Sequence, residues 1–128
     1  MNLVLIDSSV WIAYFRGIKT ARINEFENLI DNNQICVNDL ILSELLPSLY
    51  QRKESEIIDI LKSVRKIPLE INWDEIIEFQ RINLKSGINN VGIPDLIIVQ
   101  NVIQNGISLF TIDNHFHIMS KHHKFKLY

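Results

Sequence analysis

The chain has 128 residues, a length that predicts one compact domain covering residues 1–128. Apolar residues make up 47% of the chain and the formal net charge is only −2, which excludes a disordered chain and a polycation that binds nucleic acid through bulk charge. The lone Cys36 cannot form an internal disulfide, and the longest apolar run, residues 10–15, is far too short to span a bilayer. We therefore expect a reduced, cytoplasmic protein with no membrane partner.

The first half of the sequence alternates short runs rich in Val and Ile with stretches of helical period. In chain order it predicts a strand, two helices, a second strand and two more helices, at residues 2–6, 8–16, 20–31, 34–37, 39–47 and 55–64. Asn38 or Asp39 caps the third of these helices, which runs towards Pro47. The helix at residues 8–16 is apolar on almost every side, so it is either central or partly covered by another chain.

The second half of the sequence continues this alternation. It predicts a strand, two helices and two further strands separated by a short helix, at residues 66–69, 73–85, 94–105, 108–112 and 126–128. In the first of these helices, Ile76, Ile77 and Leu84 are expected to face inward. A loop at residues 86–93 with two glycines and two asparagines precedes the second helix, and Gly106 ends it.

This order of elements predicts the fold class α/β. Strands that alternate with helices build a mainly parallel sheet of four to five strands with helices on both faces, a three-layer α/β/α sandwich. In such sheets, ligands bind beyond the carboxyl ends of the strands, at the point where the winding direction reverses. The candidate functional residues should therefore be sought where strands end.

Four of the 15 acidic residues lie in apolar surroundings: Asp7, Glu44, Asp95 and Asp113. Asp7 and Asp113 each end a strand and begin a helix, so either could be an ordinary N-cap, and Asp95 could simply stabilise the first turn of its helix. Glu44 lies in the middle of an apolar helix, which predicts a buried carboxylate. Such a charge costs several kcal/mol unless it is paired or binds a metal ion.

The four acids have few candidate basic partners, since residues 32–51 and 86–120 contain no Lys or Arg. A divalent cation could supply the missing charge, and carboxylates without placed Cys or His select Mg²⁺ or Mn²⁺. Such a site suits phosphodiester hydrolysis, with the hydroxyls of Ser8, Ser9 and Thr111 close to the acids. Three lysines and all four histidines follow Asp113, and they form either a rim for a phosphate backbone or a solvated tail.

Four short segments, residues 4–12, 43–46, 92–98 and 111–116, read VLIDSSVWI, SELL, GIPDLII and TIDNHF. Together and in this order they resemble the motifs of PIN-domain ribonucleases, especially the VapC-type toxins of toxin–antitoxin pairs. The acids of these segments are separated by 37, 51 and 18 residues, and the resemblance covers nearly the whole chain. His115 departs from the pattern, because some relatives have another acid at its position.

The resemblance implies a metal-dependent endoribonuclease with RNA as its substrate and Mg²⁺ or Mn²⁺ as its cofactor. The metal-binding acids would be Asp7, Glu44, Asp95 and Asp113, with Thr111 or Ser8 assisting. The resemblance also implies a homodimer and an antitoxin partner that binds near the helix at residues 8–16.

Two alternatives belong to other functional classes. A PIN-like domain without catalytic activity could bind RNA or protein. A receiver-type phosphoacceptor domain shares the length and the alternation, but it needs paired acids after the first strand and an acceptor Asp at the end of the third. Here Asp7 is followed by two serines, and residues 66–69 contain no Asp.

Overall fold

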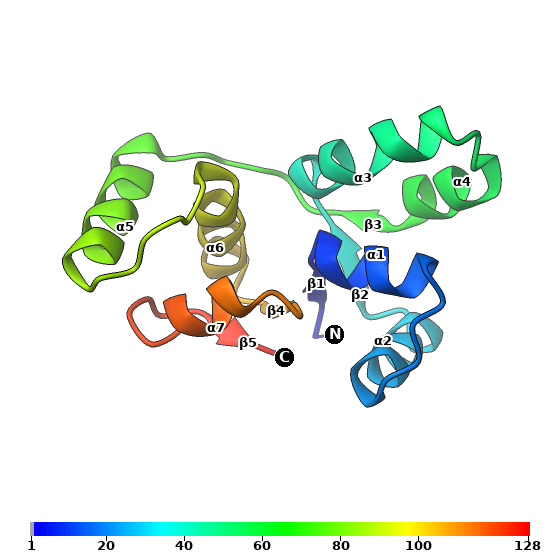
Figure 1. The fold of residues 1–128 in the computed structure, drawn as a ribbon, viewed down its shortest axis with the longest axis horizontal. Helices are drawn as coiled ribbons and strands as arrows, with labels where there is room; N and C mark the ends of the chain where they lie inside the picture. The colour runs from blue at the N-terminus through cyan, green and yellow to red at the C-terminus, as the bar shows by residue number, and fades with distance from the viewer. Residues whose placement is uncertain (1) are drawn as a thin grey trace.

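The computed structural model describes residues 2–128 and contains five parallel strands in the order β3-β2-β1-β4-β5 (Figure 1). The strands are short: β1 Val4–Ile6, β2 Ile35–Val37, β3 Arg65–Lys66, β4 Ser108–Phe110 and β5 Lys126–Leu127. The three central strands are almost fully buried, as their continuous apolar runs predict. The expected α/β class and parallel sheet are confirmed, and the strand order differs from that of receiver-type domains, in which the third strand lies next to the first.

Seven helices connect and flank the strands: α1 Ser8–Phe15, α2 Ala21–Asp31, α3 Asp39–Gln51, α4 Ser55–Ser63, α5 Trp73–Lys85, α6 Ile93–Asn105 and α7 Asn114–Met119. Helix α1 packs against α2 and α3, α3 against α4, and α5 against α6. In Figure 1, α5 and α6 lie to the left of the sheet and α2 and α4 to its right, so helices flank the sheet on both sides as expected for three layers. Among residues 2–128, no helix is both long and apolar enough to cross a bilayer.

Helix α3 is longer than the sequence predicts, because it passes through Pro47 and ends at Gln51. A proline inside a helix removes one backbone hydrogen bond, which is why Pro47 was expected to lie near the end. The buried side chains of Leu45 and Leu49 lie on either side of Pro47 and anchor both parts of the helix to the core. Pro47 itself is exposed, so tertiary packing outweighs the local cost.

Helix α5 also differs from the prediction. Ile76 is buried, but Ile77 and Leu84 are about 60% exposed, at 59% and 62%. The polar Asn83 of α5 is instead fully buried, where it contacts Met119 at the end of α7 and His123 just beyond it. The expected inward face was therefore wrong at two of its three positions.

Candidate metal centre

The candidate site lies where the winding of the sheet reverses. From the central strand β1 the chain proceeds to β2 and β3 on one side, and it returns to β4 and β5 on the other. Parallel strands with this order leave a crevice beyond the carboxyl ends of β1 and β4. Asp7 directly follows β1, and Thr111 directly follows β4, so the topology brings both to this crevice.

Asp7 is held rigidly at the end of β1. Its side chain is buried, and its oxygen Oδ2 accepts hydrogen bonds from Ser9 Oγ at 2.7 Å and from Thr111 Oγ1 at 2.9 Å. Its backbone N–H donates to the carbonyl of Phe110 at 3.0 Å, which ties it to β4. The side chain of Asp7 therefore does not cap α1, although Asp7 occupies the N-cap position.

The hydroxyl of Thr111 links Asp7 to Asp113. While it donates to Asp7, Thr111 Oγ1 accepts the backbone N–H of Asp113 at 3.0 Å. Asp113 in turn caps α7, because its Oδ1 accepts the backbone N–H of His115 at 2.9 Å. The capping interpretation of Asp113 is thus correct, and it leaves the second carboxylate oxygen, Oδ2, directed away from the cap.

Asp95 lies in the first turn of α6, where Gly92 is the N-cap and Pro94 precedes it. Partial burial, together with the negative charges of Asp113 and Asp7, raises the pKa of Asp95 to about 6. His115 acts in the opposite direction and lowers this pKa. Asp95 is therefore a carboxylate whose ionised form needs a nearby positive charge.

Glu44 lies on α3 and is more exposed than the sequence predicts. It lines a small pocket of about 160 Å³ together with Arg16 and Arg52. Desolvation of its carboxylate, followed by the charges of Asp7 and Asp95, raises the pKa of Glu44. The expectation of a buried carboxylate was wrong, because Glu44 lies with Ser43 on an exposed side of α3. The influence of Asp7 and Asp95 on its pKa nevertheless places Glu44 within electrostatic reach of both acids.

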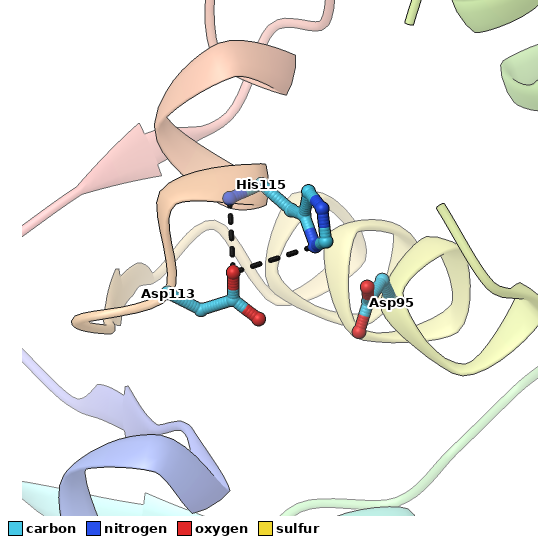
Figure 2. Close-up of side chains that lie close together, drawn as sticks. All are labelled: Asp95, Asp113 and His115. Atoms are coloured by element: carbon cyan, nitrogen blue, oxygen red, sulfur yellow. Dashed lines mark hydrogen bonds and ion pairs between the residues drawn. The ribbon is translucent and has the colours of Figure 1, made fainter. Parts of the chain in front are cut away.

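Three of the side chains converge closely. One ligand atom each from Asp95, Asp113 and His115 lies within 4.8 Å of the other two. Figure 2 shows Asp95 reaching from α6 towards Asp113 and His115 at the start of α7. Asp7 and Glu44 are not members of this close group, although both contribute to the electrostatic repulsion around it.

The acids of the crevice lack basic partners. Within residues 2–128, no Lys or Arg forms an ion pair with Asp7, Glu44, Asp95 or Asp113, and the only contact of this kind is between His115 Nδ1 and Asp113 Oδ1 at 3.5 Å. Repelling carboxylates that share a crevice are stabilised by a cation. Carboxylate oxygens at these separations fit a divalent metal ion.

A comparison with models of known protein families gives a match that spans the four motif segments. Residues 4–121 match the PIN domain. The chain belongs to the PIN domain family. The resemblance noted for the four sequence segments is thereby confirmed, and the receiver-type alternative is excluded. Among curated proteins, none matches the chain in sequence.

Solved structures share the PIN fold over nearly the whole chain. VapBC2 from Rickettsia felis, bound to a DNA fragment from its promoter, is 18% identical with a TM-score of 0.73, covering 98% of this chain and 97% of that chain. DNA-bound VapBC from Salmonella typhimurium is 16% identical with a TM-score of 0.74, covering 100% and 98%. The Mycobacterium tuberculosis sarcin-ricin loop cleaving toxin VapC20 is 15% identical with a TM-score of 0.61, covering 90% and 93%. At these identities the likeness concerns the fold.

In this PIN domain, the residues that lie next to the acids differ in two ways from those that the sequence predicted. The serine that contacts Asp7 is Ser9, whereas Ser8 has no hydrogen bond to Asp7 within residues 2–128. His115 joins Asp95 and Asp113, which no spacing rule predicts, because a turn and a helix start bring it back towards the crevice. Of the C-terminal lysines and histidines that were expected to form either a basic rim or a solvated tail, His123 fits neither, since it is buried against Asn83.

Proposed function

We propose that this PIN domain is a Mg²⁺- or Mn²⁺-dependent endoribonuclease that acts as the toxin of a toxin–antitoxin pair. The observation that supports this proposal most strongly is the group of acids at the reversal point of the sheet, none of which pairs with a Lys or Arg of residues 2–128. The family and the fold of the VapC and VapBC structures support the same activity. We propose that the domain acts on RNA in the cytoplasm.

In this proposal Asp7, Glu44 and Asp95 hold the principal ion, and Asp113 holds a second ion or orients the attacking water. An ion held there would supply the acidification of a water nucleophile and the neutralisation of charge on the phosphate. Ser9 and Thr111 fix the orientation of Asp7 through Oδ2, so its other oxygen is the one available to a ligand. Arg16 and Arg52, beside Glu44, supply positive charge for the phosphates of the RNA.

Cleavage of a labelled RNA in the presence of Mg²⁺ or Mn²⁺ tests this function. We expect EDTA to abolish cleavage. Asp7→Asn, Glu44→Gln and Asp95→Asn should each lower the cleavage rate by at least about 100-fold, because losing a residue that binds the ion directly costs more than losing a residue that only orients such a ligand. The matched control is Asp39→Asn, since Asp39 lies on the same helix as Glu44 but forms a surface ion pair with Lys66.

The control variant should cleave RNA at nearly the rate of the unmodified protein. Circular dichroism should show the same helix content in all four variants. Full cleavage by Asp95→Asn would refute the assignment of the acids. Metal binding without any cleavage of RNA would instead favour a PIN-like module that only binds RNA or protein.

We further propose that the antitoxin binds in a groove between α1, α2 and α4. The groove has a volume of about 840 Å³ and is lined mainly by Trp11, Tyr14, Phe15, Ile30, Ile57 and Ile60. Within residues 2–128, the buried indole N–H of Trp11 has no acceptor. A concave apolar surface of this kind fits an inserted segment of another protein, and it includes the apolar helix for which a partner was expected.

Co-expression with the product of an adjacent short reading frame tests this partner. We expect the two proteins to purify as a complex in which RNA cleavage is inhibited. Ile60→Glu places a charge in the groove, because Ile60 is 56% exposed there, and it should prevent complex formation while leaving cleavage intact. Normal binding by this variant would place the antitoxin elsewhere.

The exposed face of α5 supports a homodimer. Trp73, Ile77 and Leu84 are each more than half exposed on this helix. A convex apolar helix face differs from the groove, because it suits self-complementary packing against the same helix of a second copy. We therefore propose that α5 forms the dimer interface.

A further inference from the structure

The closest group of ligand atoms in the crevice includes a nitrogen, although the site is otherwise built from carboxylates. We propose that His115 is a ligand of the metal centre and shifts its preference from Mg²⁺ towards a transition-metal ion such as Mn²⁺. This inference rests on the proposed function, and it concerns the identity of the ion that the site selects.

The distances permit His115 to share an ion with two of the acids. Ligand atoms of Asp95, Asp113 and His115 lie within 4.8 Å of one another, close to twice a metal–ligand distance of about 2.1 Å. At 3.5 Å from Asp113 Oδ1, His115 Nδ1 is in contact with the carboxylate but forms no hydrogen bond with it. The imidazole is therefore free to turn its nitrogen towards an ion (Figure 2).

The backbone holds His115 at this position. Its N–H donates to Asp113 Oδ1 at 2.9 Å, and the next residue, Phe116, is fully buried in the core. Asp113 is itself fixed by Thr111, whose hydroxyl accepts the Asp113 N–H. The positions of His115 and Asp113 are thus coupled to that of Asp7 through hydrogen bonds that do not use the imidazole.

The chemistry of the donor set then decides the preferred ion. Mg²⁺ takes oxygen ligands almost exclusively, whereas imidazole nitrogen suits transition-metal ions. The three other histidines of the described chain are not members of this group: His123 is buried against Asn83, and His117 and His122 are exposed. One nitrogen among carboxylates is expected to strengthen Mn²⁺ binding more than Mg²⁺ binding.

The test loads the protein with Mn²⁺ and measures pulsed electron paramagnetic resonance together with calorimetric titrations. We expect modulation from a directly bound ¹⁴N nucleus in the unmodified protein and its loss in His115→Ala. The same variant should bind Mn²⁺ at least about tenfold more weakly and Mg²⁺ with little change. His117→Ala, on the same helix, is the matched control and should retain both the modulation and the affinity.

A second variant tests the same role through an expected gain in relative Mg²⁺ binding as well as through a lost signal. His115→Asp replaces the nitrogen by a carboxylate oxygen, so we expect it to abolish the ¹⁴N modulation and to strengthen Mg²⁺ binding relative to Mn²⁺. Both substitutions leave the backbone hydrogen bond from residue 115 to Asp113 in place. Because the side chain of His115 is half-exposed, we expect both variants to fold as the unmodified protein does.

The outcomes separate this inference from the proposed function. If Mn²⁺ binds but no ¹⁴N modulation appears, or if His115→Ala binds both ions as the unmodified protein does, the role of His115 is wrong and the metal-dependent nuclease stands. If the unmodified protein binds neither ion, the metal centre itself is wrong, and the inference fails with it.

Discussion

Two hydroxyl groups donate hydrogen bonds to the same carboxylate oxygen of Asp7. Ser9 and Thr111 both donate to Oδ2, and within residues 2–128 no group donates to Oδ1. Hydrogen bonds to the far oxygen of a ligating carboxylate orient the near oxygen, and they typically change metal affinity or activity by 10- to 100-fold when lost. The two hydroxyls thus act as positioning groups for Asp7 in the proposed site.

We predict that Ser9→Ala lowers Mn²⁺ affinity and RNA cleavage by about tenfold, because Asp7 loses one of its two donors. Ser8→Ala is the matched control, since Ser8 begins the same helix but its side chain forms no hydrogen bond with Asp7 within residues 2–128, and its effect should stay within about twofold. Calorimetric titration with Mn²⁺ and RNA cleavage measure both variants. Equal losses in the two variants would contradict the specific role of Ser9.

The sequence predicts that hydroxyl groups lie near Asp7, but it does not predict which serine supplies one of them. A run of buried β-branched residues followed by Asp7 predicts a strand end, and two adjacent serines predict a nearby hydroxyl. Which serine faces back to Asp7 depends on how α1 turns after its first residue, so local spacing could not choose between Ser8 and Ser9. The proximity of His115 to Asp95 and Asp113 was missed for a similar reason, because it depends on the packing of α7 against the rest of the fold.

At the scale of elements, a buried polar contact joins α5 to the segment after α7. His123 Nε2 lies 2.7 Å from Asn83 Oδ1, and Asn83 Nδ2 donates to Gln80 Oε1 at 3.2 Å and to the sulfur of Met119 at 3.6 Å. Burial, and secondarily the charge of His122, lowers the pKa of His123. The neutral imidazole can serve as the donor in this contact.

This contact predicts a loss of stability in mild acid. Because the pKa of His123 is lower in the folded protein than in the unfolded chain, the unfolded chain binds the extra proton first. Stability contributed by this residue is therefore present above about pH 6.5 and falls as the pH drops below it, by up to ~1.4 kcal/mol per pH unit. We expect His123→Gln to flatten this fall in urea unfolding measured from pH 8 to pH 5.

The control for His123→Gln is His117→Gln, which removes an exposed histidine of α7 and should leave the pH dependence unchanged. His123→Gln should also be less stable than the unmodified protein at pH 8, because the contact with Asn83 is disturbed. An unchanged slope in His123→Gln would mean that other groups cause the acid sensitivity.

The existence and order of most elements could be predicted from the sequence, but several faces and boundaries could not. Gly106 has the positive φ expected of a helix end, and α6 ends there. In contrast, Pro47 continues α3, and Ile77 and Leu84 point outward from α5. Periodicity alone cannot reveal that a helix carries apolar residues on an exposed face as well as on a buried one.

At the scale of the whole molecule, two apolar surfaces differ in shape and suit different partners. The groove between α1, α2 and α4 is concave, whereas Trp73, Ile77 and Leu84 lie on the exposed face of a single helix. Large exposed apolar surfaces commonly mark contacts with other chains. The proposed antitoxin and the second copy can therefore be tested independently.

We predict that the unmodified protein sediments as a dimer and that Ile77→Glu converts it to a monomer, since a charge would be buried at a self-complementary contact. Ile60→Glu is the matched control, because it places the same charge in the groove and should leave the dimer intact. Analytical ultracentrifugation measures both variants. A dimeric Ile77→Glu would place the interface on another surface.

The central position of β1 has a consequence for how the protein is made. Strand β1 pairs on both sides, but its neighbour β4 is translated about a hundred residues later. Asp7 cannot accept the hydrogen bond from Thr111, and Asp95 cannot lie close to Asp113 and His115, until translation has passed residue 115. The nascent polypeptide therefore lacks the assembled acidic crevice during most of its own synthesis, which delays any activity of that crevice inside the cell that produces it.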